Sequence, residues 1–278
     1  MNCLNRIIVA AAMIFVGCAP QFQKPQRNCS CLKSASEALA VLKTRLQNVL
    51  PLKAGGDCHL QYYADGKKYD ENFPVKLWAN PPEEIYLQGD VAFNPKGLIL
   101  GSNENEFWLS VRLKEVDSYW WGKWNEQGGY ETPKINPKRL LEAIGAAETG
   151  DEQNWSLSNQ AGLSVLTERD EQNSIIKRIY MSGCIFLISK IEYFDVNGRA
   201  AVVMELNNYE KVSNNFSVPG IIRIVRQPEN EQEDWAGITL SLKTVKPANL
   251  TEEQQKVLFT RPEPEGFKHV YKIGGNEK

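Results

Sequence analysis

Histidine and cysteine, which often bind zinc and other transition metals, are scarce in this sequence of 278 residues. The chain has two histidines and six cysteines, which leaves little material for a metal enzyme. Basic residues are not in excess either, and the formal net charge of −2 argues against nucleic-acid binding. A Gly-x-Ser-x-Gly motif, a phosphate-binding loop and a Ser-x-x-Lys motif with its partner motifs are all missing. We therefore expect a non-enzymatic protein with no bound metal or cofactor.

The N-terminus lacks a hydrophobic run long enough to span a membrane, because the apolar segment 7–16 has only ten residues. A membrane-spanning helix needs about 20, so this segment, which follows Arg6, has instead the length of a signal-peptide core. At its end, Phe15-Val16-Gly17-Cys18 resembles the bacterial lipobox, in which a small residue precedes an acylated cysteine. The resemblance implies a signal peptide over residues 1–17 and palmitate or a similar acyl chain on Cys18. A plain secretory signal with an incidental cysteine is the alternative.

The segment after the signal peptide, residues 18–33, is polar, contains Pro20 and Pro25, and is typical of a lipidated, flexible tether. The lipobox resemblance also bears on location. In enterobacterial lipoproteins an aspartate after the acylated cysteine retains the protein at the inner membrane, and this chain has Ala19 there. We therefore expect a lipid-anchored protein of the bacterial cell envelope, at the periplasmic face of the outer membrane.

Four cysteines would remain in the mature body, namely Cys29, Cys31, Cys58 and Cys184. An even number in an oxidising compartment predicts at least one disulfide, with three possible pairings. We favour a bridge from Cys29 or Cys31 to Cys58, because the intervening helix could fold back on the first strand. The alternatives are a metal or redox pair at Cys29-x-Cys31, which lacks the usual two-residue spacing, and a lone buried thiol at Cys184.

The spacing of apolar residues predicts three helices in the body of the chain. The longest covers residues 34–50, and Pro51 with Gly55-Gly56 is expected to end it. Two short helices are expected over residues 137–147 and 251–258.

Strand patterns fill most of the remaining sequence and predict two antiparallel meanders, over residues 58–124 and 163–246. Asn197-Gly198 is a strong hairpin signal within the second meander. The polar segment 149–160 is expected to be a loop, and residues 267–273 are expected to add an edge strand. The fold class is therefore mainly β with helices (α+β), with about 11 or 12 strands and few helices to cover the apolar sheet face.

Five stretches resemble, in the same order, parts of the lipoprotein-carrier superfamily of the bacterial envelope, the LolA/LolB type. They are Asn103-Glu104-Asn105-Glu106-Phe107-Trp108-Leu109, Ile135-Asn136-Pro137-Lys138-Arg139-Leu140-Leu141, Tyr193-Phe194-Asp195-Val196-Asn197-Gly198, Phe216-Ser217-Val218-Pro219-Gly220-Ile221-Ile222-Arg223-Ile224, and Leu258-Phe259 with Pro262, Pro264, Glu265 and Gly266. Each stretch is weakly specific alone, so the resemblance depends on their order over about residues 34–273. It implies a single domain over residues 34–278, folded as an incomplete antiparallel β-barrel covered by a long N-terminal helix and short helices. It also implies a cavity for acyl chains or other hydrophobic ligands.

Six residues are candidates for contact with such a ligand: Trp78, Trp108, Trp121, Leu140, Leu141 and Ile144. The tryptophans belong to the aromatic-rich first meander. The aliphatic residues form the apolar side of helix 137–147, which we expect to act as a lid. Trp120 and Trp121 are adjacent, so in a strand at most one of them faces the cavity. Ordinary core or sheet-surface packing is the alternative for each tryptophan.

Two classes of function remain. The first is an envelope lipoprotein that binds or transfers lipids or lipoproteins in a hydrophobic cavity, with a lipid or an acylated protein as its partner. The second is a non-enzymatic interaction or regulatory module that uses the same curved sheet to bind protein. A continuous apolar cavity would favour the first class, and a solidly packed interior would favour the second.

Overall fold

The structure is a computed structural model of the chain, and it describes residues 31–64, 66–92, 94–126, 136–147, 149–160, 162–182, 185–227 and 236–274. The predicted signal peptide, the lipidation site Cys18, most of the predicted tether, Cys29 and Cys184 lie outside the described residues. Within those ranges, no helix combines the length and the apolar character needed to cross a membrane.

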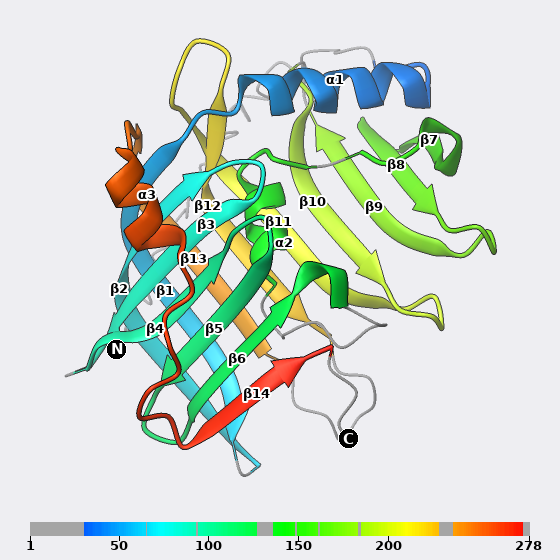
Figure 1. Ribbon diagram of the computed structural model, residues 1–278. Helices are drawn as coiled ribbons and strands as arrows, with labels where there is room; N and C mark the ends of the chain where they lie inside the picture. The colour runs from blue at the N-terminus through cyan, green and yellow to red at the C-terminus, as the bar shows by residue number, and fades with distance from the viewer. Residues whose placement is uncertain are drawn as a thin grey trace, which may run out of the picture.

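The described residues form three α-helices, two short 3-10 helices and 14 strands (Figure 1). In chain order they are α1 (Ala35–Asn48), β1 (Leu52–Ala64), β2 (Lys67–Asn80), β3 (Glu84–Val91), β4 (Asn94–Ser102), β5 (Glu106–Arg112), β6 (Asp117–Lys123), η1 (Trp124–Glu126), α2 (Pro137–Ala143), η2 (Glu152–Asn154), β7 (Trp155–Gln160), β8 (Leu163–Arg169), β9 (Ile175–Ser182), β10 (Leu187–Phe194), β11 (Ala200–Lys211), β12 (Ser217–Arg226), β13 (Ala236–Pro247), α3 (Glu252–Phe259) and β14 (His269–Ile273).

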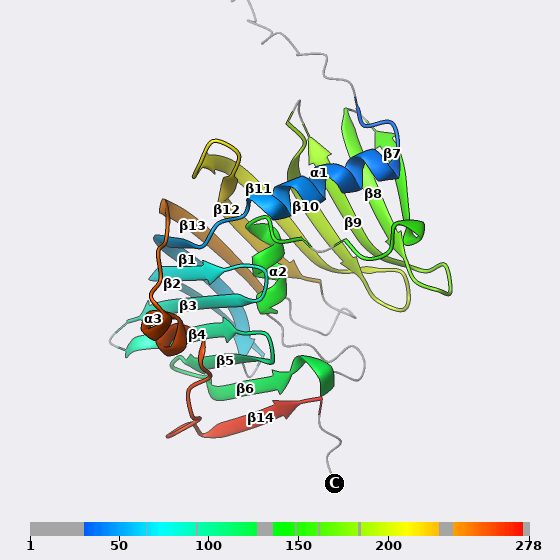
Figure 2. The same cartoon turned by 45° about the horizontal axis from the view of Figure 1, so that its top comes forward.

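All strands belong to one sheet with the order β14-β6-β5-β4-β3-β2-β1-β13-β12-β11-β10-β9-β8-β7. Two antiparallel meanders, β1 to β6 and β7 to β13, are joined by the pairing of β1 with β13. One edge is β14, which pairs parallel to β6, and the other edge is β7, so the sheet is not closed. Figure 2 shows the sheet as an arc that curves around α2. The predicted fold class, a mainly β incomplete barrel with helices, is confirmed.

Side-chain caps mark the start of α1 and of α3. Ser34 Oγ accepts a hydrogen bond from the backbone N–H of Glu37 at 3.1 Å, which caps α1. Thr251 and Gln254 form a complete capping box at α3, with each side chain accepting from the other residue's backbone N–H. Helix α2 is shorter than predicted, since Gly145 follows it with a φ of 111°, a left-handed conformation that favours glycine.

Alternation of side chains gives the sheet an inner face, toward α1 and α2, and an outer face. In β3, Leu87 is buried on the inner face, directly between Leu77 of β2 and Leu100 of β4. Helix α1 packs over β7 and β8, whereas α2 contacts β4 and β12 inside the arc (Figures 1 and 2). Helix α3 contacts β3 and lies on the far side of the strands from α2 (Figure 2). The inner face of both meanders thus forms one apolar core with α1 and α2.

Two details of the predicted fold are corrected. The sheet has 14 strands rather than 11 or 12, and β7 lies in the segment that was expected to be a loop. An edge strand pairs through its backbone and needs few apolar side chains, and β7 has only Trp155 and Leu157. The pair Gly55-Gly56 does not end the first helix but lies inside β1 at a register shift. A Cβ on Gly56 would lie 2.1 Å from the carbonyl oxygen of Ser241, so the close approach of β13 explains this glycine.

The predicted disulfide to Cys58 is wrong, because Cys58 and Cys31 are both free thiols. The reason is the path of the N-terminal segment, which does not fold back along β1. The backbone N–H of Leu32 donates to Ser164 Oγ of β8 at 3.1 Å, which holds Cys31 near the opposite half of the sheet. Cys58 is buried in the core, and burial raises the pKa of its thiol to about 12.

Candidate functional site

The apolar side of α2 is buried inside the arc of the sheet. Leu140 and Leu141 are each 1% exposed and Ile144 is 0% exposed, and all three belong to the main core. They pack together with inner-face residues of both meanders, such as Leu100 of β4 and Ile222 of β12. Three of the six predicted ligand residues therefore lie together, where α2 separates the two halves of the sheet.

Five polar residues accompany this helix, and we name them the α2 polar cluster: Arg139 and Glu142 of α2, Glu168 of β8, Lys177 of β9 and Tyr193 of β10. Lys177 Nζ donates to Glu142 Oε1 at 2.8 Å. The hydroxyl of Tyr193 donates to the other oxygen of the same carboxylate. The guanidinium carbon of Arg139 lies 4.8 Å from the centroid of the Tyr193 ring. Through these contacts α2 is attached to two neighbouring strands.

The strand register explains why these residues meet. Lys177 is directly opposite Glu168 on one side and Tyr193 on the other, and Glu168 is opposite Trp155. Residues directly opposite each other point to the same face, so the four side chains form one row on the inner face. The next row along the strands is apolar and contains Leu166, Ile179 and Ile191.

Burial sets the electrostatics of the α2 polar cluster. It lowers the pKa of Arg139 from 12.5 to about 10, although the nearby Glu142 carboxylate acts in the opposite direction. It also raises the pKa of Glu168, against the attraction of Lys177. Within the described ranges, no acceptor forms a hydrogen bond with the Arg139 guanidinium, and the buried Trp155 Nε1 has no partner either. Among the described residues, the inner face therefore holds donors of Arg139 and Trp155 that no protein acceptor engages.

The α2 polar cluster was not among the predicted sites, although one signal was present. Lys177 precedes Ile179 and Met181 at a spacing of two, so strand alternation places it on the same inner face. A lysine at a core-facing position of a strand is unusual unless it is paired. Its partner Glu142 is 35 positions away, a pairing that no local pattern indicates.

The three predicted tryptophans lie on the outer face, opposite α2. The register places Trp78, Trp108 and Trp121 in one outward row, whereas Trp120 faces inward. Trp108 is fully buried above Gly101, where a Cβ would lie 2.3 Å from the indole ring. A ligand would have to approach these tryptophans from the outer face of the sheet. Their role in ligand binding stays a prediction.

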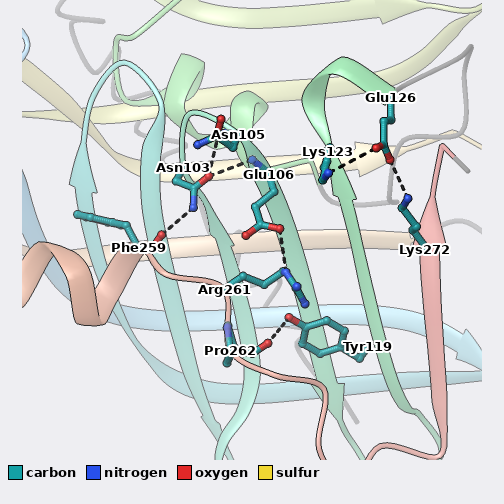
Figure 3. Close-up of polar contacts among 10 residues, drawn as sticks. All are labelled: Asn103, Asn105, Glu106, Tyr119, Lys123, Glu126, Phe259, Arg261, Pro262 and Lys272. Atoms are coloured by element: carbon teal, nitrogen blue, oxygen red, sulfur yellow. Dashed lines mark hydrogen bonds and ion pairs between the residues drawn. The ribbon is translucent and has the colours of Figure 1, made fainter.

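Residues 259–273, named here the C-terminal strap, run over this outer face to the edge strand β14 (Figure 3). Four polar contacts attach the strap to the region of β4 to β6: Asn103 Nδ2 to Phe259 O at 2.9 Å, Arg261 Nε to Glu106 Oε2 at 2.9 Å, Tyr119 Oη to Pro262 O at 2.7 Å and Lys272 Nζ to Glu126 Oε2 at 2.8 Å. The guanidinium carbon of Arg261 also lies 4.3 Å from the centroid of the Trp121 ring. The strap covers outward aromatic side chains that would otherwise be exposed.

An open groove of about 520 Å³ lies between α3 and the turns that follow β2 and β4. Its lining is largely polar and includes Glu83, Glu104, Glu252 and Lys256. This groove is separate from the apolar side of α2, so it does not correspond to the predicted hydrophobic cavity. In the described part of the chain, no group of three or more His, Cys, Asp or Glu side chains is placed to hold a metal ion.

No protein-family model matches the sequence, and no curated protein matches it. Solved structures do share its fold. A LolA superfamily protein from Nitrosomonas europaea has a TM-score of 0.51 and 12% sequence identity, over 83% of this chain and 99% of that chain. A domain named for outer membrane lipoprotein sorting, from Vibrio parahaemolyticus, has a TM-score of 0.50 and 10% identity, over 80% of this chain and 97% of that chain. At these identities the likeness concerns the fold alone, and in its fold the chain resembles the LolA superfamily.

Proposed function

We propose that this chain is an envelope lipoprotein that binds or transfers lipids or lipoproteins through the apolar inner face of its sheet. The observation that carries the proposal is the apolar inner face that both meanders share. The side chains Leu140, Leu141 and Ile144 of α2 fill the space between the meanders, so an acyl chain would lie there as α2 moves aside. The fold likeness to a LolA superfamily protein and to a domain named for lipoprotein sorting supports the same interpretation.

The energetics of α2 are compatible with exchange for a ligand. The helix has seven residues, and its apolar contacts are of the kind that an acyl chain would make in its place. Apolar burial contributes about 25 cal/mol per Å², so a chain that buries roughly 300 Å² would gain about 7 kcal/mol before the costs of binding. Before those costs the gain corresponds to a dissociation constant of several micromolar, and the costs weaken the affinity toward the millimolar range, which suits transfer better than storage.

The remaining parts of the proposal come from the sequence. Residues 34–278 would act as a single non-enzymatic domain, carried by a tether over residues 18–33 and an acyl chain on Cys18 after removal of residues 1–17. The body would then stand at the periplasmic face of the outer membrane, close to acylated clients.

Titration with a fluorescent fatty acid tests the proposal. The parent protein should bind the probe, and Leu141→Glu should weaken binding because it places a charge on the buried side of α2. The matched control is Val257→Glu on α3, where the side chain is 74% exposed and far from the inner face, and binding should be unaffected. Circular dichroism must show an intact sheet in each variant. If the correctly folded parent chain does not bind the probe, acyl-chain binding is contradicted.

The second candidate is a protein-interaction module, and two observations favour it. The inner face is filled by α2 side chains, and the polar groove beside α3 is open to solvent. A chain that binds no acyl probe but captures a purified envelope protein through this groove would support the second candidate.

A further inference from the structure

We infer that the α2 polar cluster binds the anionic head group, a carboxylate or a phosphate, of an acyl-chain ligand. This inference rests on the proposed function and extends it by naming the polar end of the ligand. It concerns Arg139 first, because its guanidinium is the natural partner of such a group.

The first step is the hydrogen-bond balance of the cluster. Glu142 accepts from Lys177 and from Tyr193, so both of its oxygens are engaged. Arg139 has five N–H donors, and nothing in the described ranges accepts a hydrogen bond from them. Among the described residues, its aromatic partner is the Tyr193 ring, and a bidentate contact would use the edge of the guanidinium plane. A carboxylate or phosphate supplies the oxygen acceptors that the cluster lacks.

The second step is the charge that surrounds this guanidinium. Arg139 is half-buried beside the Tyr193 ring, and among the described residues no carboxylate forms an ion pair with it. Glu142 lies nearby, but its charge is compensated by Lys177 at 2.8 Å. Glu168 also belongs to the row, where it lies directly opposite Lys177. An anionic head group would give Arg139 the direct charged partner that none of the described residues supplies.

The third step is the position of the cluster beside the apolar core. The row of Lys177 and Tyr193 lies two residues, or about 7 Å, along the strands from the row of Ile179 and Ile191. A head group at Arg139 would thus place its acyl chain next to the apolar side of α2. The junction of a cationic site with an apolar surface fits an amphiphile better than a neutral hydrocarbon.

The alternative is that Arg139 only fastens α2 to Tyr193 by stacking. The protein contains a matched control for stacking on the opposite face of the same strands. The guanidinium carbon of Arg178 in β9 lies 4.9 Å from the centroid of the Phe194 ring, against 4.8 Å for Arg139 and Tyr193. Because Arg178 neighbours Lys177 in β9, it points outward and away from the cluster.

The experiment uses the full chain with Cys18→Ser, so that no acyl group of its own competes. Fluorescence titrations compare cis-parinaric acid with its methyl ester at a pH of about 8, where the acid is ionised. The parent chain should bind the acid about tenfold more tightly than the ester. Arg139→Gln should weaken binding of the acid about tenfold and leave the ester within about twofold, whereas Arg178→Gln should change neither. Displacement of the acid by lysophosphatidate, compared with monoacylglycerol, then shows whether a phosphate is accepted as well as a carboxylate.

Three results would overturn the inference. Equal affinity for acid and ester in the parent chain would remove the head-group site while leaving acyl-chain binding, and so the proposed function, intact. An equal loss for both probes in Arg139→Gln would show that Arg139 only holds α2 in place. Failure of the folded parent chain to bind either probe would contradict the proposed function and this inference together.

Discussion

Lys177 Nζ of β9 lies 2.8 Å from Glu142 Oε1 of α2. This buried ion pair joins two residues that are 35 positions apart in the sequence. The two side chains are 8% and 17% exposed, so neither charge is well solvated by water. The ion pair therefore helps to hold α2 in its position on the inner face.

This arrangement predicts a strong asymmetry between single and double substitutions. Lys177→Met alone or Glu142→Leu alone would leave a largely buried charge without its hydrogen-bonded partner, which should lower the free energy of unfolding by about 3 kcal/mol. The double variant replaces both charges by apolar groups and should recover most of that loss. Urea unfolding of all four proteins measures the effect, and single variants within about 0.5 kcal/mol of the parent would contradict it.

The C-terminal strap should loosen when its central contact is removed. Arg261→Ala loses the 2.9 Å hydrogen bond to Glu106 and the stacking on Trp121, a loss of about 2 kcal/mol. Hydrogen exchange in residues 260–274 should then become faster, with the strands of the second meander unchanged. The control Arg223→Ala removes an exposed ion pair with Glu205 and should leave exchange in the strap unaltered.

Cys58 should resist alkylation in the folded protein, while the more exposed Cys31 reacts. Burial raises the Cys58 pKa from 9.0 to about 12, so the stabilising effect of the neutral thiol is complete below about pH 9 and declines as the pH rises toward 12. Cys58→Val should reduce this alkaline loss of stability, as measured by urea unfolding between pH 9 and 12. Rapid labelling of Cys58 in the native protein would be inconsistent with its position in the core.

The acyl anchor is a prediction from the sequence alone. Cys18→Ser should move the exported protein from the membrane fraction to the soluble fraction, because the acyl chain would be lost. Immunoblots of fractionated cells measure the change. An unsubstituted protein that is already soluble after export would favour the plain secretory signal.

Local patterns predicted most of the elements, because their causes are local. Apolar spacing placed α1 and α3, which Ser34 and Thr251 cap, and the Asn197-Gly198 pair lies at the turn between β10 and β11. The polar strand β7 was missed because its pairing with β8 depends on the backbone rather than on apolar alternation.

The arrangement of the candidate site could be predicted only in part. Helix α2 and its buried residues Leu140, Leu141 and Ile144 follow from spacing. Which face of the sheet Trp108 occupies does not, because alternation gives two faces without saying which one a helix will cover. The contacts of Arg139 and Glu142 with β9 and β10 depend on pairings distant in sequence.

Mass spectrometry of the folded Cys18→Ser protein, purified from bacterial cells without added lipid or detergent, tests acyl-chain binding most directly. Native spectra should show a bound species, and extraction should release a molecule with one or more acyl chains at near-stoichiometric amounts. The same preparation of Leu141→Glu should have less of it. Parent protein that is folded, free of any acyl-chain compound and unable to acquire one from added lipid would contradict binding at the inner face.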